Sequence, residues 1–211
     1  MRRAGAATRR GAANALTEEE MRRFLRKSNV EREPLPVTMT GVRMGERVLQ
    51  IGLAEPRLAS LLAAKPGLSG HSALVVHDER QAERARAVAA EAGLLVDVHI
   101  APMHALPIPA GTFDVVIVHD AAAALAPLAA SARTQAMAEG ARVLRSGGRL
   151  IALEAGTASG LRGMLRRTQP TDPAYDASGG TSAVLEAAGF RAVRLLADRD
   201  GYRFIEALKA S

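Results

Sequence analysis

Two polar residues, His119 and Asp120, follow an almost wholly apolar run at positions 114–118 (DVVIV). Such a run is typical of a strand that is buried on both faces of a parallel sheet. In open α/β sheets, ligands lie beyond the carboxyl ends of the strands, and a histidine there can act as a general base. His119 is therefore the best candidate for a catalytic base, with Asp120 shaping the site. The alternative is a polar cap on a buried strand, since adjacent residues point to opposite sides.

A glycine turn offers a second candidate site. Gly52 comes directly after the strand-like run at 48–51, and Pro56 stands near the start of a helix-like stretch. Glycine lacks a Cβ, so the backbone there can approach a ligand closely. The residues after Gly52 do not match G-x-G-x-x-G, which disfavours a nicotinamide dinucleotide site. The five histidines have no cysteine partners and no metal-ligand spacing, so no metal site is predicted.

Composition limits the class of protein. A chain of 211 residues with 48% hydrophobic residues has room for one full domain and its core. It has no cysteine, which excludes disulfides and thiol catalysis, and no apolar run long enough to suggest a membrane span. The net charge of +6 is concentrated at residues 1–33 and 157–170, so the body of the chain is close to neutral. Basic arms of this kind bind acidic surfaces weakly, and we expect nucleic-acid binding to be unlikely.

The chain is predicted to have three parts. Residues 1–15 form a disordered basic tail, residues 16–41 an N-terminal helix and linker, and residues 42–211 the main domain. The helix is expected to start at Thr17, which forms a capping box with Glu20. Its apolar face must dock on its own domain or on a partner protein.

Strands alternate with helices from Arg47 onward, which predicts a mostly parallel sheet with helices on both faces. Expected strands are 48–51, 72–76, 96–100, 114–118 and 149–154, and expected helices are 56–64, 79–92, 131–144 and 181–188. Residues 192–197 and 202–208 are joined around Asp200-Gly201, which predicts an antiparallel hairpin at the C-terminus. Residues 157–180 are expected to form a loop or lid.

Four stretches resemble class I S-adenosylmethionine-dependent methyltransferases of the type 11 branch, which includes quinone-biosynthesis enzymes. They are RVLQIGLAEPRLASLLA from Arg47, LPIPAGTFDVVIVHD from Leu106, ARVLRSGGRLIALE from Ala141 and LEAAGFRAVRLL from Leu185. The resemblance implies a Rossmann-like methyltransferase fold of class α/β. Its mostly parallel seven-stranded sheet ends in the C-terminal antiparallel hairpin.

The resemblance also implies a site for S-adenosylmethionine. Gly52 is the one glycine kept from the family's acid-x-Gly-x-Gly-x-Gly motif, whose other positions hold Gln50, Ala54 and Pro56. Gln50 replaces an acid, so it keeps an acceptor and loses the charge. The turn at Gln50, Gly52, Leu53 and Ala54 is expected to hold the methionine end of the cofactor.

The adenosine end departs further from the family. Val76 occupies the place of the acid that takes the ribose hydroxyls, and Asp78, with His77 before it, is the expected substitute. Met103 and His104 are expected near the adenine.

The leading prediction is a cytoplasmic methyltransferase that acts on a small molecule through S-adenosylmethionine, with His119 nearest the methyl acceptor. The alternative is a methyltransferase-like protein without catalysis that serves as a binding or assembly subunit. Direct nucleic-acid binding through the basic arms is the third and weakest hypothesis.

Overall fold

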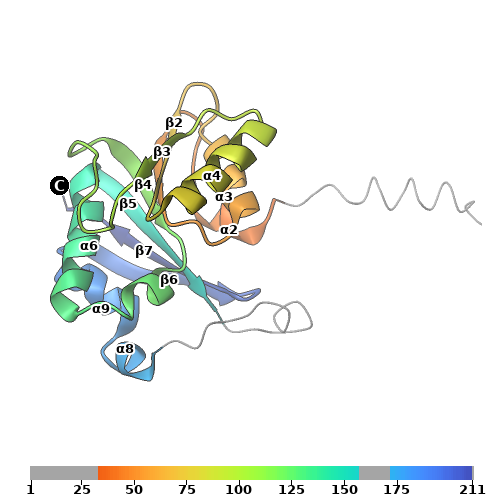
Figure 1. Ribbon diagram of the computed structural model, residues 1–211. Coiled ribbons are helices and arrows are strands. Elements are labelled where there is room, and N and C mark those ends of the chain that lie inside the picture. Colours follow the sequence, from red (N-terminus) through yellow and green to blue (C-terminus); the bar gives the residue numbers. More distant parts are fainter. Residues whose placement is uncertain (1–32, 157–171, 211) are drawn as a thin grey trace, which may run out of the picture. The chain divides into compact units, whose positions relative to one another are not determined.

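The computed structural model describes residues 33–156 and 172–210 (Figure 1). The predicted basic tail, the helix expected from Thr17 and residues 157–171 of the predicted lid lie outside these ranges. Contacts divide the chain after Pro34, and the unit that starts at Leu35 contains the fold. Among the described residues, no helix is both long enough and apolar enough to cross a membrane.

The fold is a seven-stranded sheet with the strand order β3-β2-β1-β4-β5-β7-β6. The strands are β1 (Arg47–Ile51), β2 (His71–Val76), β3 (Asp97–Ile100), β4 (Phe113–Val118), β5 (Leu144–Ala155), β6 (Arg191–Arg199) and β7 (Tyr202–Leu208). The first five pair in parallel, and β7 runs antiparallel to both β5 and β6. The predicted sheet, with its C-terminal antiparallel hairpin, is therefore confirmed.

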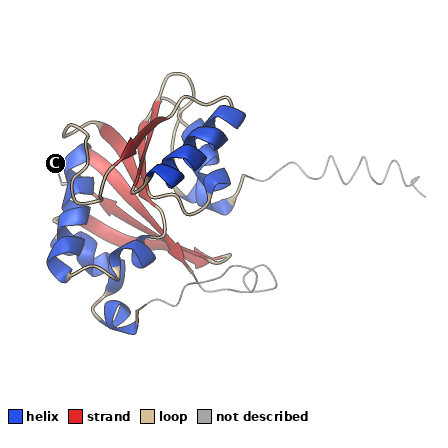
Figure 2. Ribbon diagram, in the orientation of Figure 1, coloured by secondary structure: helices blue, strands red, loops and turns tan. Residues whose placement is uncertain are grey.

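Helices cover both faces of the sheet, as Figures 1 and 2 show. They are α2 (Leu35–Met39), α3 (Pro56–Ala64), α4 (Glu79–Glu91), α5 (Ala121–Leu125), α6 (Ala130–Val143), α8 (Pro173–Ala177) and α9 (Gly180–Ala187). Alternate residues of β1 explain this arrangement, because Val48 packs on the α2–α3 side and Leu49 on the α5–α6–α9 side. Both are fully buried, as expected for a central parallel strand.

Sequence patterns do not predict the short helices α2, α5 and α8, and α8 lies within residues 157–180, which were expected to form a loop or lid. Pro34 and Pro36 are expected to break the chain, yet α2 contains Pro36 in its first turn. The missing proline N–H costs nothing there, because first-turn amides have no partner within the helix. The second helix, α5, follows Asp120 and consists of alanine and leucine only, so its sequence carries no amphipathic pattern.

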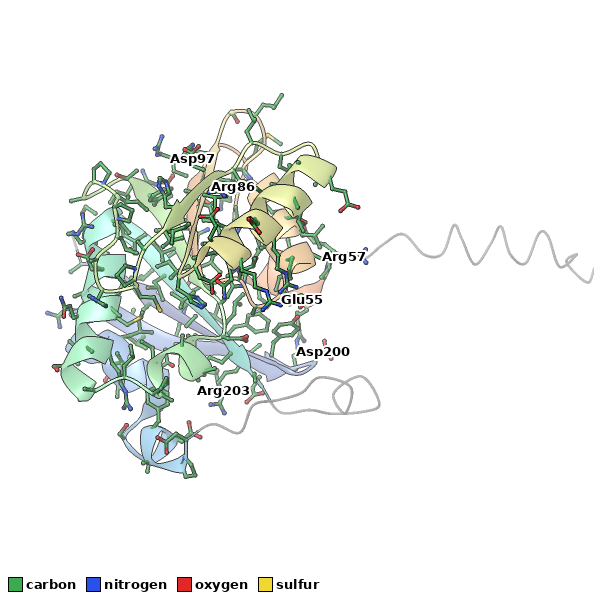
Figure 3. All side chains as sticks on the ribbon, viewed as in Figure 1. Glu55, Arg57, Arg86, Asp97, Asp200 and Arg203 are labelled. Carbon is green, nitrogen blue, oxygen red and sulfur yellow. The ribbon has the colours of Figure 1, made fainter. Side chains whose placement is uncertain are left out.

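The hairpin between β6 and β7 turns at Asp200 and Gly201, both of which have positive φ (56° and 77°). Positive φ at both central residues is the requirement of the tight type I′ turn, which favours Asp-Gly. The hairpin also contacts the start of α3, since the Tyr202 hydroxyl donates a hydrogen bond of 2.9 Å to Glu55 Oε2 at the same carboxyl edge of the sheet. Figure 3 labels Glu55 at the start of α3 and Asp200 at the hairpin.

Candidate functional site

The turn between β1 and α3 lies at the carboxyl end of the central strands. Gly52 has a φ of +83°, in the left-handed region that favours glycine. Its amide donates to the carbonyl oxygen of Val75 at 2.8 Å, which ties the turn to β2. A Cβ built on Gly52 would lie 3.5 Å from the carbonyl oxygen of His119. The turn therefore passes directly beside the end of β4 and depends on glycine.

Gln50 lies inside the protein, with only 1% of its surface exposed. Its Nε2 donates to the carbonyl oxygen of Ala59 at 2.9 Å. Its Oε1 lies 2.8 Å from His119 Nε2. Both groups of the amide thus have protein partners, and the side chain links β1 to α3 and to the end of β4. The cofactor contact predicted for Gln50 does not match this placement.

His119 is also buried, with 4% of its surface exposed. Because the Gln50 Oε1 can only accept, His119 Nε2 must carry the hydrogen of this bond. Burial lowers the pKa of His119 from 6.5 to about 4. The imidazole is therefore neutral at pH 7 and a weak base. This geometry favours a structural link over the general base that the sequence suggested, while Asp120 is exposed at the start of α5.

The end of β2 presents a different set of polar groups. Val76 is buried, and Asp78 caps α4 by accepting from the Gln81 amide at 2.7 Å. The second oxygen of Asp78 lies 3.0 Å from His77 Nε2, and 46% of the Asp78 side chain is exposed. The carboxylate thus has a structural role and still faces solvent at the carboxyl edge of the sheet.

No sequence pattern points to Gln81, yet its side chain is unusual among the described residues. Its Oε1 is buried and, among the described residues, is the only such side-chain atom with no hydrogen-bond partner. Its Nε2 lies 3.5 Å from His77 Nε2. Leaving a buried acceptor unpaired costs free energy, about 1–3 kcal/mol.

Met103 and His104 lie in the segment between β3 and β4. Met103 is partly buried against the core cluster on the α5–α6–α9 side. His104 is exposed. Both residues follow the carboxyl end of β3, and their contact with adenine stays a prediction.

An ion pair on α6 holds this segment in place. Glu139 accepts from the Leu106 amide at 2.8 Å and pairs with Arg142 at 2.6 Å. Arg142 donates to the carbonyl oxygens of Ile108 (2.7 Å) and Leu106 (3.0 Å). The hydrogen bond from Arg142 lowers the pKa of Glu139, so the pair stays ionised. We call Glu139 and Arg142 the α6 clamp.

The rest of the glycine turn is mainly apolar. Leu53 packs against the small core cluster beneath α4, and Ala54 is exposed. Pro56 occupies the first turn of α3. A cavity of about 20 Å³ lies behind the turn, among residues of α3, α4, β1 and β2. That volume suits a single water molecule, so this cavity is no cofactor pocket.

A buried polar network lies at the end of β5, and no sequence pattern predicts it. Glu154 is 5% exposed and accepts a short hydrogen bond from the Thr181 hydroxyl of α9. The Tyr175 hydroxyl of α8 lies 2.8 Å from the same Thr181 oxygen. The guanidinium carbon of Arg133 lies 4.7 Å from the centre of the Tyr175 ring. Burial raises the pKa of Glu154, and the Thr181 bond opposes that rise.

The described residues contain no group of histidine, cysteine and carboxylate side chains that could hold a metal ion. The edge of the sheet instead offers a glycine turn and a half-exposed carboxylate. Such an edge suits an organic ligand with hydroxyl groups.

Comparison with known proteins identifies the fold's family. Residues 49–152 match a family model of a methyltransferase domain of type 11. This match supports the resemblance of the chain to the class I S-adenosylmethionine-dependent methyltransferases. The resemblance of the segments that begin at Arg47, Leu106 and Ala141 is thereby confirmed.

Two relatives of this chain are the ubiquinone/menaquinone biosynthesis C-methyltransferases of Bordetella parapertussis and Bordetella bronchiseptica. Each is 33% identical over 135 residues, which is 64% of this chain and 47% of the relative. The chain thus matches about half the length of these curated relatives.

Solved structures with this methyltransferase fold include proteins of different chemistry. A methyltransferase from Aquifex aeolicus has a TM-score of 0.65 at 17% identity, covering 91% of this chain and 98% of its own. The [4+2]-cyclase SpnF has a TM-score of 0.61 at 19% identity, covering 95% of this chain and 84% of its own. At such identities the likeness shows the fold alone. The matches give no support to the alternative of an inactive subunit or to a protein partner.

Proposed function

We propose that this chain is a methyltransferase that uses S-adenosylmethionine to methylate a small molecule in the cytoplasm. The observation that carries the proposal is the turn at Gly52. This turn lies within the matched methyltransferase domain, at the carboxyl edge where α/β sheets bind ligands. Its left-handed backbone and missing Cβ allow a ligand to approach the main chain.

The residues at this edge fit the proposed cofactor. The backbone at Gly52, Leu53 and Ala54 would hold the methionine end. Asp78 offers a half-exposed carboxylate to the ribose hydroxyls. When bound, S-adenosylmethionine supplies an electrophilic methyl group.

The adenine would lie against the segment between β3 and β4. Met103 offers a polarizable thioether there, and sulfur makes favourable contacts with aromatic rings. His104, which is exposed, completes this side of the proposed site. The α6 clamp fixes the backbone just beyond these two residues.

Reduced quinones are the first acceptors to test. The two Bordetella relatives are named as C-methyltransferases of ubiquinone and menaquinone biosynthesis. The ring carbon of an ionised hydroquinone is already nucleophilic, so positioning supplies much of the catalysis. His119 is buried and neutral, so the hydroxyl proton of the hydroquinone and the hydrogen that the methyl group displaces from the ring carbon would pass to solvent.

The test is formation of S-adenosylhomocysteine from S-adenosylmethionine in the presence of reduced quinones, phenols and amines. We expect the product to form with a hydroxyl-bearing aromatic acceptor and not without an acceptor. Asp78→Asn keeps a side-chain acceptor for the Gln81 amide and loses the charge, so it should raise the KM for S-adenosylmethionine and leave the KM for the acceptor unchanged. If every acceptor class fails while S-adenosylhomocysteine binds, the proposed transferase activity is wrong.

A further inference from the structure

Gln50 and His119 form a pair that joins three elements of the proposed site. Gln50 leaves β1 one residue before its end, and His119 follows directly on β4. The two strands are neighbours in parallel register, with Gln50 opposite Ile117. Residues 50, 117 and 119 therefore point to the same face of the sheet, which α3 covers.

The two polar groups of the Gln50 amide each have one hydrogen-bond partner. His119 Nε2 donates to Gln50 Oε1 at 2.8 Å, and Gln50 Nε2 donates to the Ala59 carbonyl oxygen at 2.9 Å. The Ala59 carbonyl lies in the first turns of α3, just after the glycine turn. These two hydrogen bonds thus connect the end of β4 to β1, and β1 to α3, which follows Gly52 in the sequence.

Backbone bonds place Gly52 inside this frame. The His119 amide donates to the Ile51 carbonyl at 2.9 Å, and the Gly52 amide donates to the Val75 carbonyl at 2.8 Å. The His119 carbonyl oxygen stands 3.5 Å from where a Gly52 Cβ would be. A shift of the His119 side chain would therefore also move the His119 carbonyl group, which Gly52 faces.

We propose that Gln50 and His119 are a matched pair of positioning residues that set the shape of the Gly52 turn, and that neither contacts the cofactor. The proposal rests on the proposed function. The proposal explains why position 50 holds glutamine where the family motif has an acid. A carboxylate at position 50 has no hydrogen to donate to Ala59, so one link of the chain would be lost.

The decisive variant is Gln50→Glu, which restores an acid of nearly the same shape. A carboxylate beside the imidazole favours the imidazolium form, so the pKa of His119 should rise above its value of about 4. Affinity for S-adenosylhomocysteine should fall by about tenfold at pH 7, as expected for one lost hydrogen bond at a positioned turn. Affinity should also depend on pH between 5 and 8 more steeply than it does in wild type.

The conservative variant His119→Gln separates positioning from simple loss of structure. A glutamine amide reaches about as far as His Nε2 and can donate to Gln50 Oε1. We expect it to bind S-adenosylhomocysteine within about threefold of wild type, whereas His119→Leu should lose about tenfold. Thermal unfolding of each variant shows that the fold is kept.

Nuclear magnetic resonance gives a readout that does not need the ligand. In wild type the His119 ring should stay neutral, with its proton on Nε2, from pH 5 to pH 8. Gln50→Ala should speed hydrogen exchange at the Gly52 amide, and Gly93, a left-handed glycine distant in sequence, should be unchanged.

Two results would overturn the proposal. One is a Gln50→Glu protein that binds S-adenosylhomocysteine as tightly as wild type or more tightly, since Gln50 would then face the ligand. The other is unchanged exchange at Gly52 in Gln50→Ala. If wild type binds no S-adenosylhomocysteine, the proposed function fails, and the exchange and titration results still decide whether the pair shapes the turn.

Discussion

At the scale of single residues, two buried ionisable groups shape how stability depends on pH. His119 has a lowered pKa, and Glu154 has a raised one. Both shifts have burial as their largest cause, because burial disfavours the charged form of either group. Their effects on stability have opposite signs, since one group resists gaining a proton and the other resists losing one.

His119 should make the protein less stable in acid. Its pKa is about 4 in the folded protein and 6.5 for an unperturbed histidine, so between these values the unfolded chain binds the proton more readily. The free energy of unfolding should therefore fall by roughly 2–3 kcal/mol between pH 7.5 and pH 4.5. Urea titrations of wild type and His119→Gln measure this. Parallel curves for the two proteins would contradict it.

Glu154 should make the protein less stable as pH rises through its raised pKa. Below that pH the folded carboxyl is protonated, and above it the buried charge must be kept in the fold. Glu154→Gln retains an acceptor for Thr181 and cannot ionise, so it should be more stable than wild type at pH 8 and differ less at pH 5. A matched Thr181→Val variant should steepen the loss at pH 8. The idea fails if Glu154→Gln is destabilised equally at both pH values.

At the scale of elements, the α6 clamp fixes the segment between β3 and β4. Arg142 joins α6 to two carbonyl oxygens of this segment and to Glu139. The segment carries Met103 and His104 and has no regular secondary structure of its own between Ala101 and Thr112. Its conformation therefore depends on the side chains that satisfy its backbone.

Loss of the clamp should destabilise both the fold and the proposed adenine side. We expect Arg142→Ala to lower the free energy of unfolding by about 2 kcal/mol, since hydrogen bonds to charged groups are worth roughly 1.5–3 kcal/mol and this side chain is partly exposed. Protease cleavage should begin within residues 101–112. The matched control is Arg86→Ala, which removes the exposed ion pair with Glu79 on α4 and should cost under about 0.5 kcal/mol. Similar losses in the two variants would count against the clamp.

Sequence patterns predicted the longer elements because those patterns are local. The helix over α4 has its capping residue, Asp78, and a glycine just past its end. The helix over α5 could not be found in this way, because five alanine and leucine residues have no periodicity. The start of β5 is also not predicted, because Gly147 indicates a turn whereas the strand begins at Leu144.

The candidate site was predicted less completely than the fold, because its contacts join distant parts of the chain. Gly52 could be found from the turn it makes. The bond between Gln50 and His119 spans 69 residues, and no local pattern reports it. Thr181 and Tyr175 carry no signal of their own, and they matter only because α8 and α9 bring them to Glu154.

At the scale of the whole molecule, the order of strands explains where a ligand must bind. The chain runs outward from β1 to β3, returns to β4 beside β1, and continues to the other edge. This reversal between β1 and β4 is the switch point at which open α/β sheets bind ligands. Gly52 and His119 lie on either side of it. The antiparallel strand β7, which lies between β5 and β6, distinguishes this sheet from one that is parallel throughout.

The central claim is that this edge binds S-adenosylmethionine, and calorimetric titration with S-adenosylhomocysteine tests it most directly. Two variants give a matched comparison. Gly52→Ala and Gly93→Ala both place a side chain at a left-handed residue, at a similar cost of about 1–2 kcal/mol. Gly52 faces the His119 carbonyl, and nothing lies within 4 Å of a Cβ at Gly93.

We predict micromolar binding by the wild-type protein, binding within about threefold of it in Gly93→Ala, and a loss of at least about tenfold in Gly52→Ala. No binding by the wild-type protein at millimolar ligand would contradict the account, and so would equal affinities in the two variants.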